Sequence, residues 1–173
     1  SVEPRKNHLC VLEAYERYAG QTATPRPLHV VGGRGWQSDA IHDQMAKLRG
    51  QGLAVEYRGY VDDRTLRDAY RSAFGLLQPS WHEGFGLPVL EAFSQGLPVI
   101  ASDLGSLPEV SGGAALHCSA SQPEKWVETM VELDQDKDLQ KQLSVKGIER
   151  AAAFSWGKTA KTVLELAKSL AVT

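Results

Sequence analysis

Short apolar runs alternate with stretches of helical periodicity along most of the chain. Runs of four or five apolar residues are too short for a typical helix and are typical of strands buried on both faces. The predicted strands cover residues 28–31, 53–57, 74–77, 97–101 and 114–117. The glycine-rich turns follow strands, so these turns are expected at the C-terminal ends of strands.

Apolar residues at helical spacing occupy the segments between the predicted strands. Pro4 is well placed as the first residue of one helix, which Gly20 can end. Ser38 is expected to cap the next helix, and Asp62 or Asp63 a short third one. The apolar positions of these three helices are Leu9, Leu12, Tyr15 and Ala19, then Ile41, Met45 and Leu48, then Leu66, Ala69 and Tyr70.

A helix is expected over Pro88–Gln95, and the last third of the sequence is helical and rich in charge. Ser121 and Glu124 have the spacing of a capping box, and the final helix is expected to start near Ser155. The apolar positions of the last three helices are Trp126, Met130, Leu133, Leu139, Leu143, Ile148, Val163, Leu166 and Leu170. We interpret the four tryptophans as packing residues: Trp36, Trp81, Trp126 and Trp156.

This alternation of strand and helix predicts an α/β fold. We expect a three-layer, Rossmann-like domain with a parallel, doubly wound sheet and a helical C-terminal third. No internal repeat, low-complexity tract or linker divides the sequence, so residues 1–173 are expected to form one domain. In such sheets ligands bind beyond the C-terminal ends of the strands, where the glycine-rich turns fall.

The composition narrows the function classes. The 173 residues carry a net charge near −2, so the chain has no overall excess of positive charge that would favour binding to nucleic acid. No apolar run approaches the length of a membrane span, and no signal-peptide pattern opens the chain. Cys10 and Cys118 are expected to be buried free thiols, which favours a cytosolic compartment. Because the sequence starts at Ser1 with almost no room for a first strand, we expect a piece of a longer polypeptide.

The most informative motif lies between Ser80 and Glu91. Glu83 and Glu91 stand eight residues apart around a glycine-containing turn, and Pro88 opens the helix that follows. A turn of this kind exposes backbone N–H groups and a helix N-terminus adds partial positive charge, which together suit a phosphate. A carboxylate one turn into the helix can accept hydrogen bonds from a sugar diol, so a nucleotide-sugar fits the motif.

Two further turns follow strands, at residues 32–35 and 59–61, and their small residues would allow a ligand close to the backbone. Arg5 and Lys6 fall in the first turn of the first helix, where a lysine can meet the negative charge of a leaving diphosphate. The plainer interpretation is that these two are surface charges. A lone Gly-x-Gly sequence is also weak evidence for a binding site. Acidic residues favour helix N-termini whatever their function.

The string Glu-Gly-Phe-Gly-Leu-Pro-Val-Leu-Glu, residues 83–91, resembles the E-x7-E signature of retaining glycosyltransferases of family 4, which have the GT-B fold. The resemblance extends over essentially the whole chain. It includes, in family order, residues 3–8, 31–36, 59–61, 92–102, 107–110 and 154–156. Residues 3–8 with 31–33 look most like the bacterial and archaeal mannosyltransferase branch. This chain resembles only the C-terminal, donor-binding domain of such an enzyme.

The resemblance implies a role for each motif residue. Glu91 would hold the ribose hydroxyls of the nucleotide, and Glu83 would contact the transferred sugar. Lys6 would bind the diphosphate, and Glu83 and Lys6 are the expected catalytic residues. The remaining donor-site residues are Arg5, Gly33, which borders the donor cleft, Tyr60 and Val61 against the base, and the backbone of Gly84, Phe85, Gly86 and Leu87.

One departure from the family pattern concerns the phosphates. Many members carry an arginine five residues before the lysine, where this chain has Ser1, so Arg5 would have to compensate in part. Retaining transfer in this family implies no metal and no cofactor beyond the nucleotide-sugar. Lys6 and the helix dipole would stabilise the departing nucleoside diphosphate while the acceptor hydroxyl attacks from the same face.

The implied donor is a GDP- or UDP-linked hexose, with mannose a candidate, and the acceptor is a glycan or a lipid-linked glycan held by an N-terminal domain. The branch builds surface polysaccharides such as O-antigen and lipopolysaccharide at the cytoplasmic face of the inner membrane, so peripheral membrane association is expected through that other half. Two alternatives remain: a non-catalytic nucleotide-sugar-binding module, and a sugar-nucleotide epimerase, for which we find no matching motif.

Overall fold

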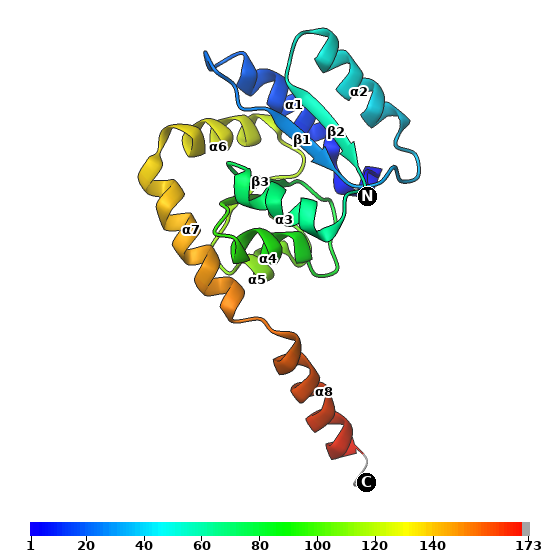
Figure 1. The fold of residues 1–173 in the computed structure, drawn as a ribbon, viewed down its shortest axis with the longest axis vertical. Helices are drawn as coiled ribbons and strands as arrows, with labels where there is room; N and C mark the ends of the chain where they lie inside the picture. The colour runs from blue at the N-terminus through cyan, green and yellow to red at the C-terminus, as the bar shows by residue number, and fades with distance from the viewer. Residues whose placement is uncertain (171–173) are drawn as a thin grey trace.

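The computed structural model describes residues 1–170 as alternating helices and strands (Figure 1). A 3₁₀ turn, η1, covers Pro4–Lys6. The strands are β1 Leu28–Val31, β2 Val55–Gly59, β3 Leu76–Gln78, β4 Val99–Ser102 and β5 Leu116–Cys118. The helices are α1 His8–Ala19, α2 Asp39–Gly50, α3 Asp63–Ser72, α4 Leu87–Ser94, α5 Leu107–Ser111, α6 Pro123–Gln135, α7 Lys137–Ala152 and α8 Trp156–Leu170.

All strand pairs are parallel, as predicted, but the strands form two sheets rather than one. β1 pairs with β2, beginning at Leu28 opposite Val55. β3, β4 and β5 form the second sheet in that order, with Ile100 of β4 opposite both Leu77 and Leu116. The expectation of a single continuous sheet was therefore wrong in one respect, because β1 and β3 do not pair with each other among the residues described.

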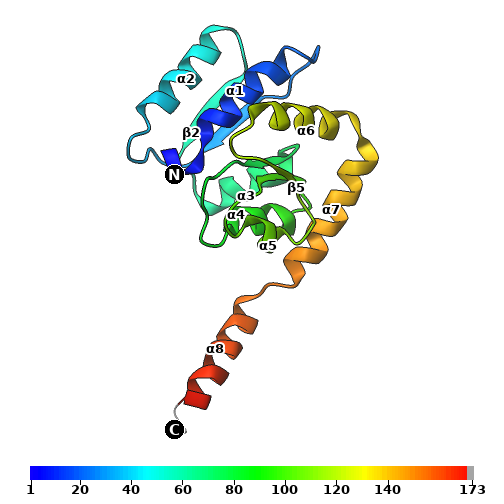
Figure 2. The same cartoon turned by 180° about the vertical axis from the view of Figure 1, so that it is seen from behind.

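Strand β4 shows how the three layers arise. All four of its residues are buried, since a strand covered on both faces presents alternate side chains to two cores. Ile100 joins the core that α1, α2 and α6 cover, whereas Val99 and Ala101 join the core beneath α4 and α5. Figure 2 shows α1 and α6, which pack against each other, on the same side of the sheets.

Most predicted helices are present, and the corrections concern their ends. Pro4 begins η1 rather than α1, because Asn7 takes a left-handed conformation (φ 55°) and breaks the chain direction before His8. Asp62 caps α3 through the amide of Thr65 as expected. Ser38 is the N-cap residue of α2, as predicted, but its hydroxyl donates to the carbonyl of Gly35 instead of accepting from a helix amide. Ser121 does not cap α6, whose N-cap residue is Gln122. The five-residue helix α5 was not predicted.

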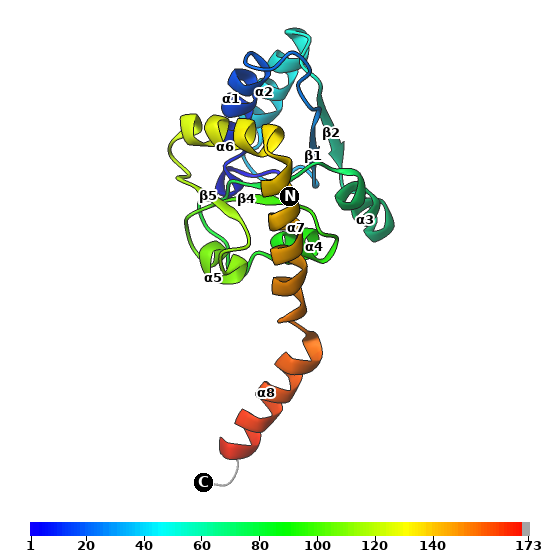
Figure 3. The same ribbon diagram turned by 90° about the vertical axis from the view of Figure 1, so that its left-hand side faces the viewer.

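The C-terminal third differs most from expectation. Helix α8 extends away from the rest of the molecule (Figure 3) and buries none of its described side chains, so Val163, Leu166 and Leu170 are not core residues here. Trp126 is fully buried, as predicted. The packing role assigned to Trp36, Trp81 and Trp156 was wrong, because all three are exposed.

Candidate functional site

The N-terminal segment lies against the loop that follows β3. The side-chain amide of Asn7 donates to the carbonyl of Pro79 at 3.1 Å and to that of Ala120 at 2.8 Å. The amide of Trp81 donates to the carbonyl of Arg5 at 2.9 Å. Asn7 tolerates the left-handed conformation that this path requires, as asparagine does more readily than most residues. These contacts bring Arg5 and Lys6 next to the glutamate motif.

Glu83 is the centre of a buried polar cluster. Its Oε1 accepts hydrogen bonds from Lys6 Nζ at 2.6 Å, from Gln78 Nε2 at 2.7 Å and from Ser80 Oγ at 2.7 Å. Its backbone carbonyl accepts from the hydroxyl of Ser106 at 3.0 Å. A buried carboxylate requires such partners, since an unpaired charge is costly away from water. Oε1 is thereby saturated, whereas within residues 1–170 Oε2 has only Arg5 Nη1 as a donor, at 3.4 Å.

The charges around Glu83 keep it ionised. Burial by itself raises its pKa, but the hydrogen bonds from Lys6 and Ser80 and the charges of Lys6 and Arg5 outweigh that effect and hold the pKa below its usual value. Arg5 also donates to the carbonyl of His82 at 2.7 Å and pairs with Glu3 at 2.7 Å. Lys6 therefore sits in a fixed position with its charge partly neutralised by Glu83.

The turn between the two glutamates leads directly into α4. Gly86 has a φ of 98°, and a Cβ there would lie 2.9 Å from Leu107, so the turn needs glycine at this position. Gly84, Phe85 and Leu87 are exposed, which leaves this stretch of backbone accessible. The amide of Val89 donates to the carbonyl of Gly86 at 3.0 Å, so this amide is not free to bind a phosphate.

Glu91 lies one turn into α4 with its carboxylate exposed. The hydroxyl of Tyr70 on α3 donates to its Oε2 at 3.0 Å, which leaves Oε1 for another partner. Burial, followed by the Glu91 charge, raises the pKa of Tyr70, so this hydroxyl stays protonated and donating. Tyr70 is a residue that sequence reasoning missed as part of the site, because its spacing matched a helix core.

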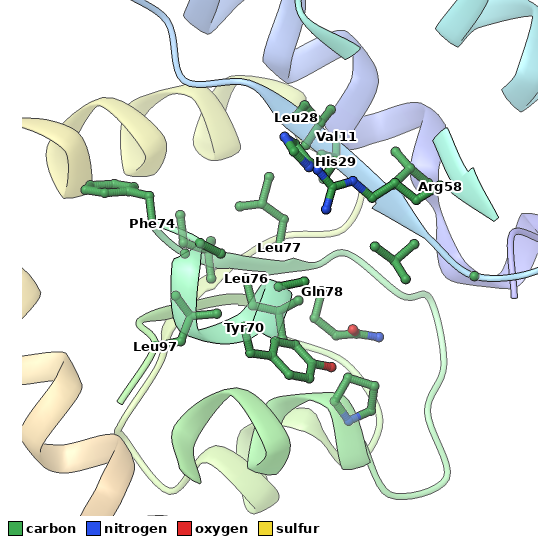
Figure 4. Close-up of a pocket in the computed structure, with 18 of the residues that line it drawn as sticks. Val11, Leu28, His29, Arg58, Tyr70, Phe74, Leu76, Leu77, Gln78 and Leu97 are labelled. Atoms are coloured by element: carbon green, nitrogen blue, oxygen red, sulfur yellow. The ribbon is translucent and has the colours of Figure 1, made fainter. Parts of the chain in front are cut away.

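Some of the predicted site residues line a cavity of about 660 Å³ (Figure 4). Lys6, Tyr60, Val61 and Glu91 all line it, at the C-terminal ends of β1, β2 and β3. The structure thus brings these four predicted residues together. The other predicted residues do not line the cavity: Arg5, Gly33, Glu83, Gly84, Phe85, Gly86 and Leu87.

Gln78 and Ser80 were also missed. Each is a polar side chain beside a short apolar strand, and the structure buries both against Glu83. Gly33 accepts from the amide of Val2 at 2.8 Å, so its carbonyl holds the N-terminal segment. Cys10 and Cys118 are buried free thiols, as predicted, and burial raises the pKa of Cys10 to about 11.

Among residues 1–170, no three histidine, cysteine, aspartate or glutamate side chains gather in a way that could hold a metal ion. Within the same described part of the chain, no helix has the length and apolar character needed to cross a bilayer.

Curated relatives match most of the chain. O-antigen chain mannosyltransferase B of Escherichia coli is 36% identical over 156 residues, which is 90% of this chain and 41% of that protein. The serotype-specific mannosyltransferase WbdA of Escherichia coli is 28% identical over 95% of this chain and 20% of its own length. The chain therefore spans less than half the length of these relatives.

Solved structures share the fold. Sucrose-phosphate synthase from Thermosynechococcus elongatus superposes with a TM-score of 0.85 over 99% of this chain and 44% of its own, at 24% identity. The C-terminal domain of a glycosyl transferase group 1 family protein from Francisella tularensis gives 0.78 over 88% of this chain and 80% of its own, at 20% identity. The family model described as "Glycosyl transferases group 1" matches residues 1–136. The motif at residues 83–91, the parallel α/β fold and these matches agree: this chain belongs to the glycosyl transferases group 1 family.

Proposed function

We propose that this chain binds the nucleoside-diphosphate sugar for a retaining hexosyltransferase. The observation that carries the proposal is the meeting of Lys6, Tyr60, Val61 and Glu91 at one end of a cavity, beyond the C-terminal ends of parallel strands. A cation, an exposed aromatic ring and a carboxylate with one free oxygen are the groups that a diphosphate, a base and a ribose diol require.

The proposed chemistry is charge stabilisation of a leaving group. As the bond between the anomeric carbon and the diphosphate oxygen breaks, negative charge grows on that oxygen. The acceptor hydroxyl forms the new bond to the anomeric carbon from the same face and gives its proton to the departing diphosphate. Lys6 is preorganised by Glu83 at 2.6 Å, so little reorganisation is needed when the charge develops. The N-terminus of α4 adds partial positive charge. We propose that this transfer needs no metal.

Glu83 has a different proposed role from Glu91. Its saturated Oε1 positions Lys6, and its Oε2 is the oxygen left to accept a hydroxyl of the transferred sugar. Glu91 would hold the ribose through Oε1, with Tyr70 holding the other oxygen. Arg5, close to Glu83, is the residue available to share the diphosphate charge with Lys6.

The names of the relatives suggest the finer assignments. Because two of them are mannosyltransferases of Escherichia coli, we propose mannose as the sugar and GDP as its carrier, with UDP as the other candidate. We further propose a glycan or lipid-linked acceptor bound by polypeptide outside this chain, and work at the cytoplasmic face of the inner membrane by peripheral association.

Calorimetric titration with GDP, UDP and ADP, each alone and with its sugar attached, tests the proposal. We expect weak binding with a preference for one base. Glu91→Gln should weaken it roughly tenfold to a hundredfold, since a hydrogen bond to a charged group is worth about 1.5–3 kcal/mol. Glu132→Gln, on an exposed position of α6, is the matched control and should change nothing. Absence of binding by all six compounds, or equal binding by Glu91→Gln, would overturn the proposal.

A second measurement separates a transferase from the non-catalytic module. We expect this chain alone to turn over no donor, and a longer polypeptide that also binds acceptor to transfer the sugar. In that longer polypeptide, Lys6→Met should lower the rate of transfer more than it weakens donor binding, because Lys6 acts on charge that develops in the transition state. Binding without any transfer by the longer polypeptide would favour the non-catalytic module.

A further inference from the structure

The turn between Glu83 and Gly86 is held from one side by the segment that leads into α5. The hydroxyl and the amide of Ser106 both donate to the carbonyl of Glu83, at 3.0 Å and 3.4 Å. At Gly86, a Cβ would lie 2.9 Å from the side chain of Leu107, so the turn and the start of α5 are in close contact. The position of this side of the turn therefore depends on the position of α5.

The C-terminal end of α5 is fixed by a residue in the last turn of α7, which lies beside it (Figure 2). The guanidinium of Arg150 donates from Nε to the carbonyl of Val110 at 2.8 Å and from Nη2 to the carbonyl of Glu109 at 2.6 Å. Gly112, the C-cap residue of α5, has a φ of 54°, and a Cβ there would lie 2.6 Å from Arg150 Nε. Glycine is required at this position, because only its missing side chain leaves room for the guanidinium. Arg150 thus joins α5 to α7.

Arg150 also contacts the phenyl ring of Phe154, which follows α7. Its Cζ lies 4.7 Å from the centre of that ring, within the range of a cation–π contact. The ring of Phe154 in turn meets the ring of Phe85, with the ring centres 5.9 Å apart and the planes at 87°. Such an edge-to-face arrangement is favourable for two aromatic rings. Since Phe85 lies within the turn, the turn is also held from its second side.

These contacts form a closed chain around the turn. They run from Glu83 to Ser106, along α5 to Arg150, and from Arg150 through Phe154 back to Phe85. Phe85 belongs to neither hydrophobic core of the described chain and is 46% exposed. The position of its side chain therefore depends on Phe154 more than on core packing.

A turn that binds a ligand through its backbone gains from being ordered beforehand. Two of the residues between Glu83 and Leu87 are glycines, Gly84 and Gly86, and glycine loses more conformational freedom on ordering than any other residue. If the turn were mobile in the free chain, binding would have to supply the free energy that orders it, and the affinity would fall. A side chain that holds Phe85 in place before the ligand arrives removes part of this cost.

We propose that Phe154 is a positioning residue for donor binding. It holds Phe85, and with it the accessible backbone of residues 84–87, in the conformation that receives the diphosphate and the transferred sugar. Phe154 itself does not line the cavity, so it acts through Phe85 rather than by touching the donor. Arg150 supports it from the other side by stacking on its ring while bound to α5. This inference rests on the proposed function, because it assigns the turn to the binding of a nucleotide-sugar.

Three variants of this chain test the inference. Phe154→Leu removes the ring, Phe154→Tyr keeps it, and Trp156→Leu removes a ring that is close in sequence but 79% exposed. Nitrogen-15 relaxation of the ligand-free chain measures the order of the amides of residues 84–87. We expect Phe154→Leu to lower their order parameters from about 0.85 to below about 0.6. Phe154→Tyr should retain most of this order, and Trp156→Leu, the matched control, should retain all of it.

Calorimetric titration of the same variants with GDP- and UDP-linked sugars measures the effect on binding. Phe154→Leu should weaken donor binding about threefold to tenfold, the ratio expected for the loss of one edge-to-face pair. Because Phe154 acts through Phe85, adding Phe154→Leu to Phe85→Leu should weaken donor binding no further. The melting temperature of each variant, followed by circular dichroism, checks that the chain remains folded at the temperature of the titration.

Three results would overturn the inference. The first is an unchanged order of residues 84–87 in Phe154→Leu, which is measured without any ligand. The second is a loss of order with unchanged donor affinity, and the third is additive losses of affinity from Phe85→Leu and Phe154→Leu. If the parent chain bound no donor, the proposed function would fail, whereas a loss of order in Phe154→Leu would still support Phe154 as the residue that positions the turn.

Discussion

The ion pair between Lys6 and Glu83 should contribute more to stability than any exposed pair. Its Nζ–Oε1 distance is 2.6 Å, and the two side chains are only 19% and 8% exposed. Breaking a buried pair costs about 3–5 kcal/mol because one charge is left without its partner. Because Glu83→Gln keeps an acceptor oxygen, we expect it to lower the free energy of unfolding by about 3 kcal/mol, the lower end of that range.

Lys6→Met should lower the free energy of unfolding by less than Glu83→Gln does, by about 1–2 kcal/mol. Glu83 then still accepts hydrogen bonds from Gln78 and Ser80 and keeps Arg5 nearby. In the double variant Lys6→Met/Glu83→Gln, no charge is left stranded, so the combined loss should fall short of the sum of the single losses by about 1–2 kcal/mol. The free energy of unfolding is measured by urea denaturation, followed by circular dichroism.

Lys125 and Glu128 form the matched control. Their charged atoms are 2.7 Å apart, close to the 2.6 Å between Lys6 and Glu83, but the side chains are 57% and 64% exposed. Because water and salt screen an exposed pair, the same cycle should give losses and a coupling close to zero. The reasoning would be refuted by strictly additive losses at Lys6 and Glu83, or by a Glu83→Gln loss no larger than that of Glu128→Gln. An unchanged slope of free energy against urea is the check that the unfolded state is comparable.

Three further predictions concern stability, each read from the same urea denaturation. Asn7→Gly should lower the free energy of unfolding by about 2–3 kcal/mol, because two buried hydrogen bonds are lost. Asn7→Ala should lower it by about 1 kcal/mol more, because alanine resists the left-handed conformation. Equal losses for the two variants would contradict this. Gly147→Ala should cost about 1–3 kcal/mol, since its Cβ would lie 2.8 Å from the buried ring of Phe93, and adding Phe93→Leu should recover part of that loss. Burial is the main cause that lowers the pKa of His8 from 6.5 to about 4, so the unfolded state takes up the proton first. Stability should therefore fall by about 3 kcal/mol between pH 6.5 and pH 4, and His8→Phe should lose that part of the pH dependence.

Local patterns were enough to place most elements. Strand β4 appears at nearly the predicted position because a strand covered on both faces needs consecutive apolar residues. Strand β1 is also at its predicted position, although only Val30 of its four residues is buried. Helix α5 was missed because five residues are too few to show a helical period. The start of α1 was misplaced because proline suits the first turn of a 3₁₀ segment as well as that of an α-helix, and only the backbone at Asn7 distinguishes them.

Only some residues of the candidate site could be predicted from the sequence, and their contacts could not. The glycine turn and the two glutamates could be read from the sequence, and Lys6 could be added from the resemblance to the family. The pairing of Lys6 with Glu83 spans 77 positions, and that of Tyr70 with Glu91 joins two helices. No periodicity encodes such contacts, because they arise only when the chain folds back on itself.

The sequence by itself determined the parallel α/β class, the order of most elements and the residue types available at the strand ends, since these depend on short-range patterns of burial and turn formation. The tertiary structure decided what those residues do to one another. It buried Glu83 beneath Lys6, left α8 exposed, and placed β1 and β3 in separate sheets. Each outcome depends on which surfaces pack together after folding. An exposed helix face can have the same sequence pattern as a buried one, so the sequence pattern alone does not distinguish them.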